Sequence, residues 1–220
     1  MAGPHPIGVR AVVFDVGETL VDETRIWTDW ADWLRVPRLT FLATLGAVIA
    51  LGGDHRAVFD IVRPGIDVGA EWERRRAAGR ADPLGPADFY PDAEPCLQTL
   101  HAAGYRVGIV GNQPATTDAL LQGLPVPLAI ASSSATWGVA KPDPAFFVRV
   151  AGELGLDPGE VAYVGDRLDN DVRPAAAAGM VAVFVRRGPW ALIQAGRLNP
   201  PEAAICVETL AELPEALARL

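Results

Sequence analysis

Two kinds of apolar pattern alternate along most of the chain. Short apolar runs rich in β-branched residues predict strands buried on both faces of a sheet, at residues 9–16, 105–110, 128–131, 161–164, 181–185 and 203–207. Longer helix-forming stretches, most of them closed by a glycine, predict helices at residues 93–103, 115–122, 143–154, 172–178 and 214–220. Strands that alternate with helices over short connections predict an α/β fold with a doubly wound parallel sheet.

The pattern changes after the first predicted strand. Tryptophans recur there at helical spacing, a dense apolar stretch follows at residues 39–51, and strand-like alternation is missing. The Pro- and Gly-rich segment 82–86 marks the end of this region. We therefore expect a small all-helical domain inserted into the α/β domain. The expected domains are residues 22–87 for the helices and residues 1–21 with 88–220 for the α/β part.

The aromatic and basic residues of the helical region invite a ligand-binding interpretation. At helical spacing, however, Trp27, Trp30 and Trp33 are more typical of a packed core. The arginine run at residues 74–76 is more typical of a solvated helix face, with Glu71 available as a partner four residues away. We expect core and surface roles for these residues.

Polar residues stand at the carboxyl ends of the predicted strands. Asp15 ends the first strand, and Gly17 allows a sharp turn away from the sheet. The second strand ends at Gly111 and Asn112, and the fourth leads into Asp166. Because parallel strands share one direction, these residues meet at the edge where open α/β sheets bind ligands.

Carboxylates that converge at this edge favour a bound cation. Asp15 and Asp166, with Asp171 five residues beyond Asp166, would repel one another without one. A set of hard oxygen ligands of this size suits Mg²⁺. The alternative interpretation is that Asp166, Asp169 and Asp171 only cap the helix predicted near residue 172.

Four stretches, taken in this order, resemble the motifs of the haloacid dehalogenase-like (HAD) superfamily. They are residues 12–20 with Asp15, residues 107–112, residues 138–143 with Lys141, and residues 161–171. The resemblance extends from about residue 9 to residue 188. It implies a Rossmann-like α/β core and a helical cap domain inserted after the first motif. It also implies hydrolysis through an aspartate nucleophile, and in most members of the superfamily the substrate is a phosphate ester.

The resemblance also implies roles for individual residues. Asp15 would be the nucleophile that forms an aspartyl-phosphate, and Lys141 would hold this carboxylate and the phosphate together. The implied phosphate-binding residues are Gly111, Asn112 and Lys141. The implied Mg²⁺ ligands are Asp15, the Gly17 backbone carbonyl, Asp166 and Asp171. The implied substrate is a small phosphorylated metabolite.

Two positions depart from the family pattern. Gly17 stands where family phosphatases usually carry an aspartate that protonates the leaving group, and losing such an acid typically slows a reaction about 10²–10⁴-fold. Gly111 stands where a serine or threonine hydroxyl usually contacts the phosphate. Glu18, Asp22 or a residue of the helical region could supply the proton instead, and an acyl phosphate would need none.

These departures leave two other functions open. One is a non-catalytic protein of the same fold that binds a phosphorylated metabolite. The other is a metal-independent 2-haloacid dehalogenase, because dehalogenases of the superfamily also lack the second aspartate. The paired aspartates Asp166 and Asp171 argue against this last function.

Composition limits the classes of binding partner and the cellular compartment that we expect for this protein. A net charge of -8 and a pI near 4.9 argue against binding of nucleic acid or of an anionic membrane. Two distant cysteines, and an N-terminus without a signal-peptide pattern, indicate a reducing cytoplasm. The apolar stretch 39–51 is shorter than the roughly 20 residues of a membrane span. We expect a monomer, or a homodimer formed through that stretch.

Overall fold

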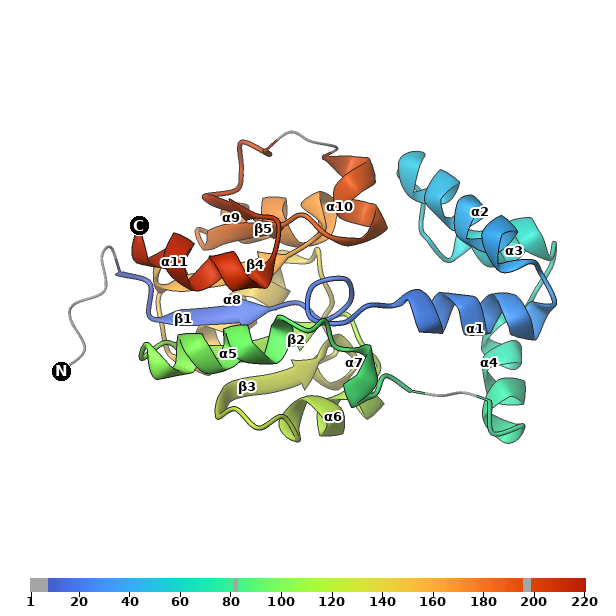
Figure 1. Ribbon diagram of the computed structural model, residues 1–220, viewed down its shortest axis with the longest axis horizontal. Helices are drawn as coiled ribbons and strands as arrows, with labels where there is room; N and C mark the ends of the chain where they lie inside the picture. The colour runs from blue at the N-terminus through green and yellow to red at the C-terminus, as the bar shows by residue number, and fades with distance from the viewer. Residues whose placement is uncertain (1–7, 81–82, 196–198) are drawn as a thin grey trace. The chain divides into compact units, whose positions relative to one another are not determined.

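The computed structural model describes residues 8–80, 83–195 and 199–220 (Figure 1). The chain forms two compact units, one of Met1–Asp22 with Gly85–Leu220 and one of Glu23–Leu84. The first unit contains the predicted sheet, and the second contains only helices among its described residues.

A six-stranded parallel sheet forms the centre of the first unit. Its strands follow the order β3-β2-β1-β4-β5-β6, so the direction of winding reverses between β1 and β4. The strands are β1 (Ala11–Phe14), β2 (Arg106–Gly111), β3 (Leu128–Ser133), β4 (Val161–Gly165), β5 (Val181–Val185) and β6 (Ile205–Val207). Both central strands are completely buried, as the unbroken apolar runs predict. The predicted α/β fold class is confirmed.

Helices cover both faces of this sheet. α5 and α11 lie together on one face, and α8 and α9 lie on the other (Figure 1). The α-helices of the unit are α5 (Ala93–Ala102), α6 (Asp118–Gln122), α7 (Ser134–Trp137), α8 (Pro144–Leu154), α9 (Arg173–Ala177), α10 (Gly188–Gln194) and α11 (Leu213–Ala218). The ends of α8 follow its local sequence, because the Asp143 carboxylate accepts a hydrogen bond from the Ala145 amide and Gly155 ends the helix at a φ of 60°.

Several boundaries differ from those predicted. β3 continues to Ser133 because its pairing with β2 continues to Gly111. The helix predicted at 115–122 begins as a 3₁₀ turn, and the one predicted at 172–178 is preceded by a π-helical turn, η5 (Leu168–Val172). α7 and α10 were not predicted, because one or two turns contain too few residues to establish a period.

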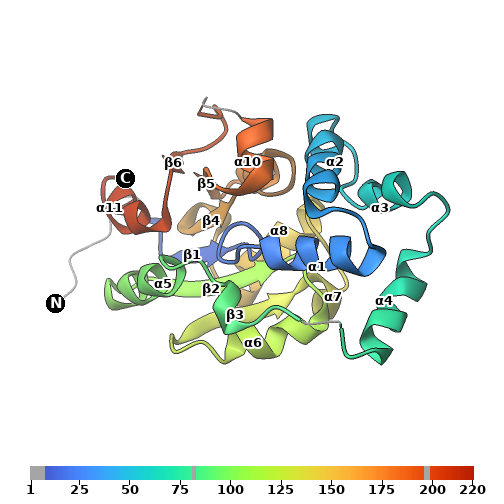
Figure 2. The same ribbon diagram turned by 45° about the vertical axis from the view of Figure 1, so that its right-hand side comes forward.

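The second unit contains four helices in its described part, drawn in blue to teal in Figure 2. They are α1 (Thr24–Leu34), α2 (Arg38–Ala50), α3 (Ala57–Val62) and α4 (Val68–Ala77). Trp27, Trp30, Phe41 and Phe59 pack together, with the rings of Trp30 and Phe59 4.8 Å apart. Trp27 and Trp30 are buried, which confirms the expected core role of these two residues.

One expectation about the arginine run is wrong. Arg75 is only 3% exposed, and its guanidinium lies 4.2 Å from the centre of the Trp30 ring. Glu71 pairs instead with Arg74, three residues away at 2.7 Å, and accepts a hydrogen bond from the Trp33 indole. The Trp30 ring of α1 creates a favourable site for a buried cation, and no pattern within α4 reveals it.

None of the described helices is by itself long and apolar enough to cross a membrane. α1 and α2 together pass the same test of length and composition, but the chain bends by 117° between them. Phe41 and Leu45 of α2 are buried, whereas Leu39 and Leu51 at its ends are exposed.

Candidate active site

Three aspartates meet where β1 and β4 end. Asp15 follows β1, Asp166 follows β4, and Asp171 lies in η5, the turn that comes next. β1 and β4 are paired neighbours, and the Asp15 amide donates to the Val164 carbonyl at 2.9 Å. One oxygen from each carboxylate lies within 4.8 Å of the others, and all three residues are buried. Shared strand direction and the pairing of β1 with β4 thus bring together the aspartates predicted to meet.

Lys141 is the cation of this cluster. Its Nζ lies 2.6 Å from Asp15 Oδ1 and 2.5 Å from Asp171 Oδ1, and its side chain is inaccessible to solvent. Burial alone would lower the pKa of Lys141, but the carboxylates of Asp15 and Asp171 outweigh it and raise this pKa well above the ordinary value. The lysine is therefore charged at every physiological pH. It holds the predicted nucleophile and a predicted metal ligand at once.

Asn112 positions the segment that carries this lysine. Its side-chain amide donates to the Lys141 carbonyl at 2.8 Å, and its side-chain oxygen accepts from the Lys141 amide at 2.9 Å. This pair of hydrogen bonds links the end of β2 to a loop 29 residues later. The family motifs imply that Asn112 lies near the phosphate, but nothing in the sequence pairs the two segments, so this contact could not be predicted.

The charges of Asp166 and Asp171 are poorly compensated. Burial, more than any other factor, raises the pKa of Asp171 to about 6, although the charge of Lys141 opposes the rise. Burial also raises the pKa of Asp166 well above its ordinary value, and the charges of Asp171 and Asp15 add to the effect. Both carboxylate oxygens of Asp166 are buried without a hydrogen-bond partner among the described residues. Such orphaned oxygens fit a bound cation, and an all-oxygen donor set suits a hard divalent one.

The alternative that these aspartates only cap a helix is wrong. Asp171 accepts a hydrogen bond from the Arg167 amide, outside α9. Asp169 bonds to the side chains of Arg167 and Gln194. The residue before α9 is Val172, which provides no side-chain cap. The reason is the π turn, which directs Asp171 toward the sheet edge instead of the helix terminus.

Two glycines leave room for the carboxylates. A Cβ on Gly111 would overlap Asp15 Oδ1, and a Cβ on Gly165 would overlap the side chain of Asp171. Gly111, one of the two departures from the family pattern, therefore lies directly against the predicted nucleophile. Its lack of a side chain lets Asp15 reach Lys141 in the observed geometry.

Gly111→Ser is expected to lower turnover about 10²-fold, because its Cβ displaces the Asp15 carboxylate and misplacement by about an ångström has effects of this size. The measurement is kcat for the activity that the family motifs imply, phosphate release with saturating Mg²⁺. Gly152→Ser is the matched control, because a Cβ on Gly152 meets no neighbouring atom. A gain in turnover would mean instead that the serine hydroxyl restores a missing phosphate contact.

Asp166→Asn is expected to stabilise the metal-free protein by about 1–3 kcal/mol near neutral pH, because it removes a buried charge to which no described residue donates a hydrogen bond. The folded-state pKa of Asp166 is raised, so wild-type stability falls as pH rises above the unfolded value. The advantage of the variant should therefore shrink on acidification.

Urea unfolding in EDTA at about pH 5 and about pH 8 measures this difference. Saturating Mg²⁺ should reverse the order, since it stabilises only a protein that binds it. An asparagine variant less stable than wild type at the higher pH, in EDTA, would contradict the prediction.

The fold and this geometry together define a class of protein. An open parallel sheet with a cluster of charged residues at the carboxyl ends of its central strands, where winding reverses, belongs to the doubly wound α/β proteins that bind ligands at that edge. The family model of haloacid dehalogenase-like hydrolases matches residues 9–179. The chain belongs to this family and is a hydrolase.

Individual relatives agree with this assignment. The chain is 31% identical over 206 residues to a glyceraldehyde 3-phosphate phosphatase of Methanopyrus kandleri, covering 83% of this chain and 86% of the relative. The crystal structure of a HAD phosphatase from Thermococcus onnurineus is similar with a TM-score of 0.61 and 26% identity, over 95% of this chain and 98% of that one. A structure described as a dehalogenase with an intermediate complex has a TM-score of 0.67 and 24% identity, over 97% and 99% of the two chains, and supports the fold alone.

Proposed function

We propose that the protein is a Mg²⁺-dependent phosphatase of a small phosphorylated metabolite, acting through an aspartyl-phosphate on Asp15. The observation that carries the proposal is the buried cluster in which Lys141 contacts Asp15 and Asp171, while both oxygens of Asp166 lack a hydrogen bond from any residue that the structure describes. The named activity of the Methanopyrus relative, glyceraldehyde 3-phosphate phosphatase, supports a substrate of this class.

In the proposed reaction, the Asp15 carboxylate attacks phosphorus and forms an O–P bond. The P–O bond to the leaving group breaks, and the leaving group takes the electron pair. Water then attacks phosphorus, which releases inorganic phosphate and regenerates the carboxylate. Lys141 orients Asp15 and offsets negative charge on the phosphoryl oxygens.

A Mg²⁺ ion, when bound, supplies the charge screening that lets a carboxylate approach a phosphate. The residues proposed to hold it are Asp15, the Gly17 carbonyl, Asp166 and Asp171. The proposed phosphate contacts are Gly111, Asn112 and Lys141. The helical unit is proposed to be the cap domain. The protein is proposed to be a cytoplasmic monomer or homodimer that binds neither nucleic acid nor a membrane.

The leaving group must depart without a proton from position 17, because Gly17 has no acidic side chain. Good leaving groups depart without a proton, so an acyl phosphate or an aryl phosphate should be hydrolysed faster than an alkyl phosphate. A missing general acid typically lowers the rate about 10²–10⁴-fold, so we expect acyl or aryl phosphates to be preferred over alkyl phosphates by a factor of this size.

Phosphate release from acetyl phosphate, an aryl phosphate and glyceraldehyde 3-phosphate, each with Mg²⁺ and with EDTA, tests the proposal. We expect turnover that EDTA abolishes and that is fastest with the acyl or aryl substrate. If the protein hydrolyses no member of a broad panel of phosphate compounds but binds one of them tightly, the result would favour the non-catalytic alternative suggested by Gly17 and Gly111. Activity on 2-haloacids that survives EDTA would favour the dehalogenase alternative.

A further inference from the structure

Glu18 has an unusual backbone conformation for its residue type. Its φ is 51°, in the left-handed region that glycine adopts most easily, and the residue is only 5% exposed. It lies three positions after Asp15, in the turn that leaves β1. Glycine would form this turn with less strain and without burying a carboxylate. A function of the carboxylate itself would account for both the strained backbone and the buried carboxylate.

The surrounding residues hold this side chain in one place. The Tyr90 hydroxyl donates a hydrogen bond to Glu18 Oε2 at 2.7 Å. Gly188, which follows β5, leaves the space that the carboxylate fills, because a Cβ there would lie 2.5 Å from Glu18 Oε2. A tyrosine from one segment and a glycine from another thus fix the position of the Glu18 carboxylate.

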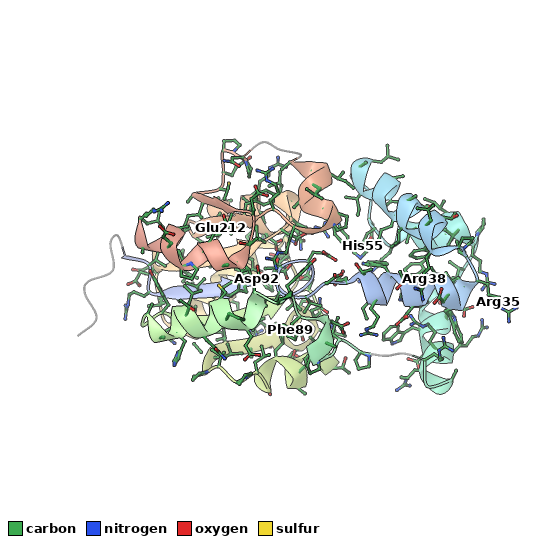
Figure 3. All side chains as sticks on the ribbon, in the orientation of Figure 1. Arg35, Arg38, His55, Phe89, Asp92 and Glu212 are labelled. Atoms are coloured by element: carbon green, nitrogen blue, oxygen red, sulfur yellow. The ribbon has the colours of Figure 1, made fainter. Side chains whose placement is uncertain are left out.

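Tyr90 is held in turn by a partly buried ion pair. The Arg187 guanidinium lies 4.3 Å from the centre of the Tyr90 ring and forms two hydrogen bonds with Asp92, the residue labelled at the start of α5 in Figure 3. Burial and the charge of Glu18 both raise the pKa of Tyr90, so its hydroxyl keeps its proton and remains a donor. The Tyr90 hydroxyl therefore remains available as a donor to Glu18 across the physiological range of pH.

The Glu18 side chain reaches across the end of the strand that Asp166 follows. Glu18 follows β1 and lies against Gly188, which follows β5, and β4 lies between these two strands in the sheet. The charge of Glu18 contributes to the raised pKa of Asp166, after burial and the charges of Asp171 and Asp15. Both oxygens of Asp166 are buried and lack a hydrogen-bond partner among the described residues. A fourth negative charge at this edge of the sheet adds to the requirement for a cation.

We propose that Glu18 is a positioning residue of the metal centre, a fourth buried carboxylate held by Tyr90 and Gly188 that strengthens binding of a divalent cation by Asp15, Asp166 and Asp171. This inference rests on the proposed function, because it assumes that the cluster binds Mg²⁺. It assigns a role to a residue that replaces neither the missing acid at Gly17 nor any of the predicted ligands.

Isothermal titration of the full, metal-free chain with Mg²⁺ tests this inference without using activity. Glu18→Gln keeps the size of the side chain and an acceptor for Tyr90 but removes the charge, and should weaken Mg²⁺ binding about 10-fold, the usual effect of losing a residue that supports a metal ligand. Glu18→Gly relieves the left-handed backbone and should weaken binding at least as much. The matched control is Glu153→Gln, which removes one charge from the exposed part of α8 and should leave the affinity unchanged.

The outcomes separate this inference from the proposed function. If wild type binds Mg²⁺ and Asp166→Asn does not, but Glu18→Gln binds within about twofold of wild type, the role of Glu18 is overturned and the metal site stands. If wild type itself does not bind Mg²⁺, both are overturned. If circular dichroism finds that Glu18→Gln does not fold, Glu18→Gly decides by the same criterion.

Discussion

Asp15→Asn is expected to abolish Mg²⁺-dependent phosphate release, with a loss of at least about 10⁴-fold in kcat. An amide is a far weaker nucleophile than a carboxylate, so the proposed O–P bond does not form. The substitution keeps the shape of the side chain, and it lowers the negative charge of the buried cluster. The fold should therefore survive, and the loss should lie in the chemical step.

Two measurements check this result. Steady-state phosphate release gives kcat, and acid quenching with a phosphate-labelled substrate should trap label on the wild-type protein and none on the variant. Asp157→Asn is the matched control, because Asp157 is an exposed aspartate before β4, at the opposite end of that strand. Turnover within tenfold of wild type would contradict the assignment of Asp15 as nucleophile.

Lys141→Met is expected to affect stability and activity together. The variant keeps the apolar stem of the side chain but leaves Asp15 and Asp171 without the cation that bonds both. Removing one partner of a buried ion pair typically destabilises by about 3–5 kcal/mol. Loss of the charge that orients the nucleophile should also lower kcat about 10³-fold, within the range for removal of an oriented charged group.

The pH dependence of this effect follows from the pKa shifts. The raised pKa of Lys141 keeps its stabilising contribution constant below the ordinary lysine value. The pKa of Asp171 is already raised to about 6 by burial, and it should rise further without the lysine. Protonation of the carboxylates then relieves their repulsion, so the stability deficit should be largest near pH 8 and smaller near pH 5.

Urea unfolding in EDTA at these two values of pH measures the deficit, and activity is compared at a temperature where both proteins are folded. Excess Mg²⁺ should recover part of the stability and little of the activity, because a cation can offset the charge but cannot replace the bond to Asp15. An equal deficit at both values of pH would contradict the electrostatic explanation.

Much of the architecture could be predicted because it depends on local pattern. A short apolar run rich in β-branched residues indicates a strand buried on both faces wherever it lies, and β1, β2, β4 and β5 contain such runs. Because parallel strands share one direction, the aspartates that follow β1 and β4 necessarily lie at the same edge of the sheet. Short elements such as α7 escaped prediction, since a single turn has no period.

The chemistry of the site was only partly predictable. Residue types and order indicated Asp15, Asp166 and Asp171 as one group, and the family motifs added Lys141. The hydrogen bonds between Asn112 and Lys141, 29 residues apart, and the overlap that any side chain on Gly111 would cause are contacts that no local pattern encodes. Their importance emerges only when β1, β2 and the loop before α8 are packed together.

The sequence by itself determined the order of strands and helices, the helical region after β1, and the aspartates at the carboxyl ends of the strands. These features depend on the periodicity of apolar residues and on chain direction, which are local properties. Only the tertiary structure decided that Arg75 is buried over Trp30, that both oxygens of Asp166 lack a hydrogen bond within the described part of the chain, and that Tyr90 holds Glu18. Each of these depends on burial and on distances between residues far apart in the chain, and such quantities exist only once the chain has folded.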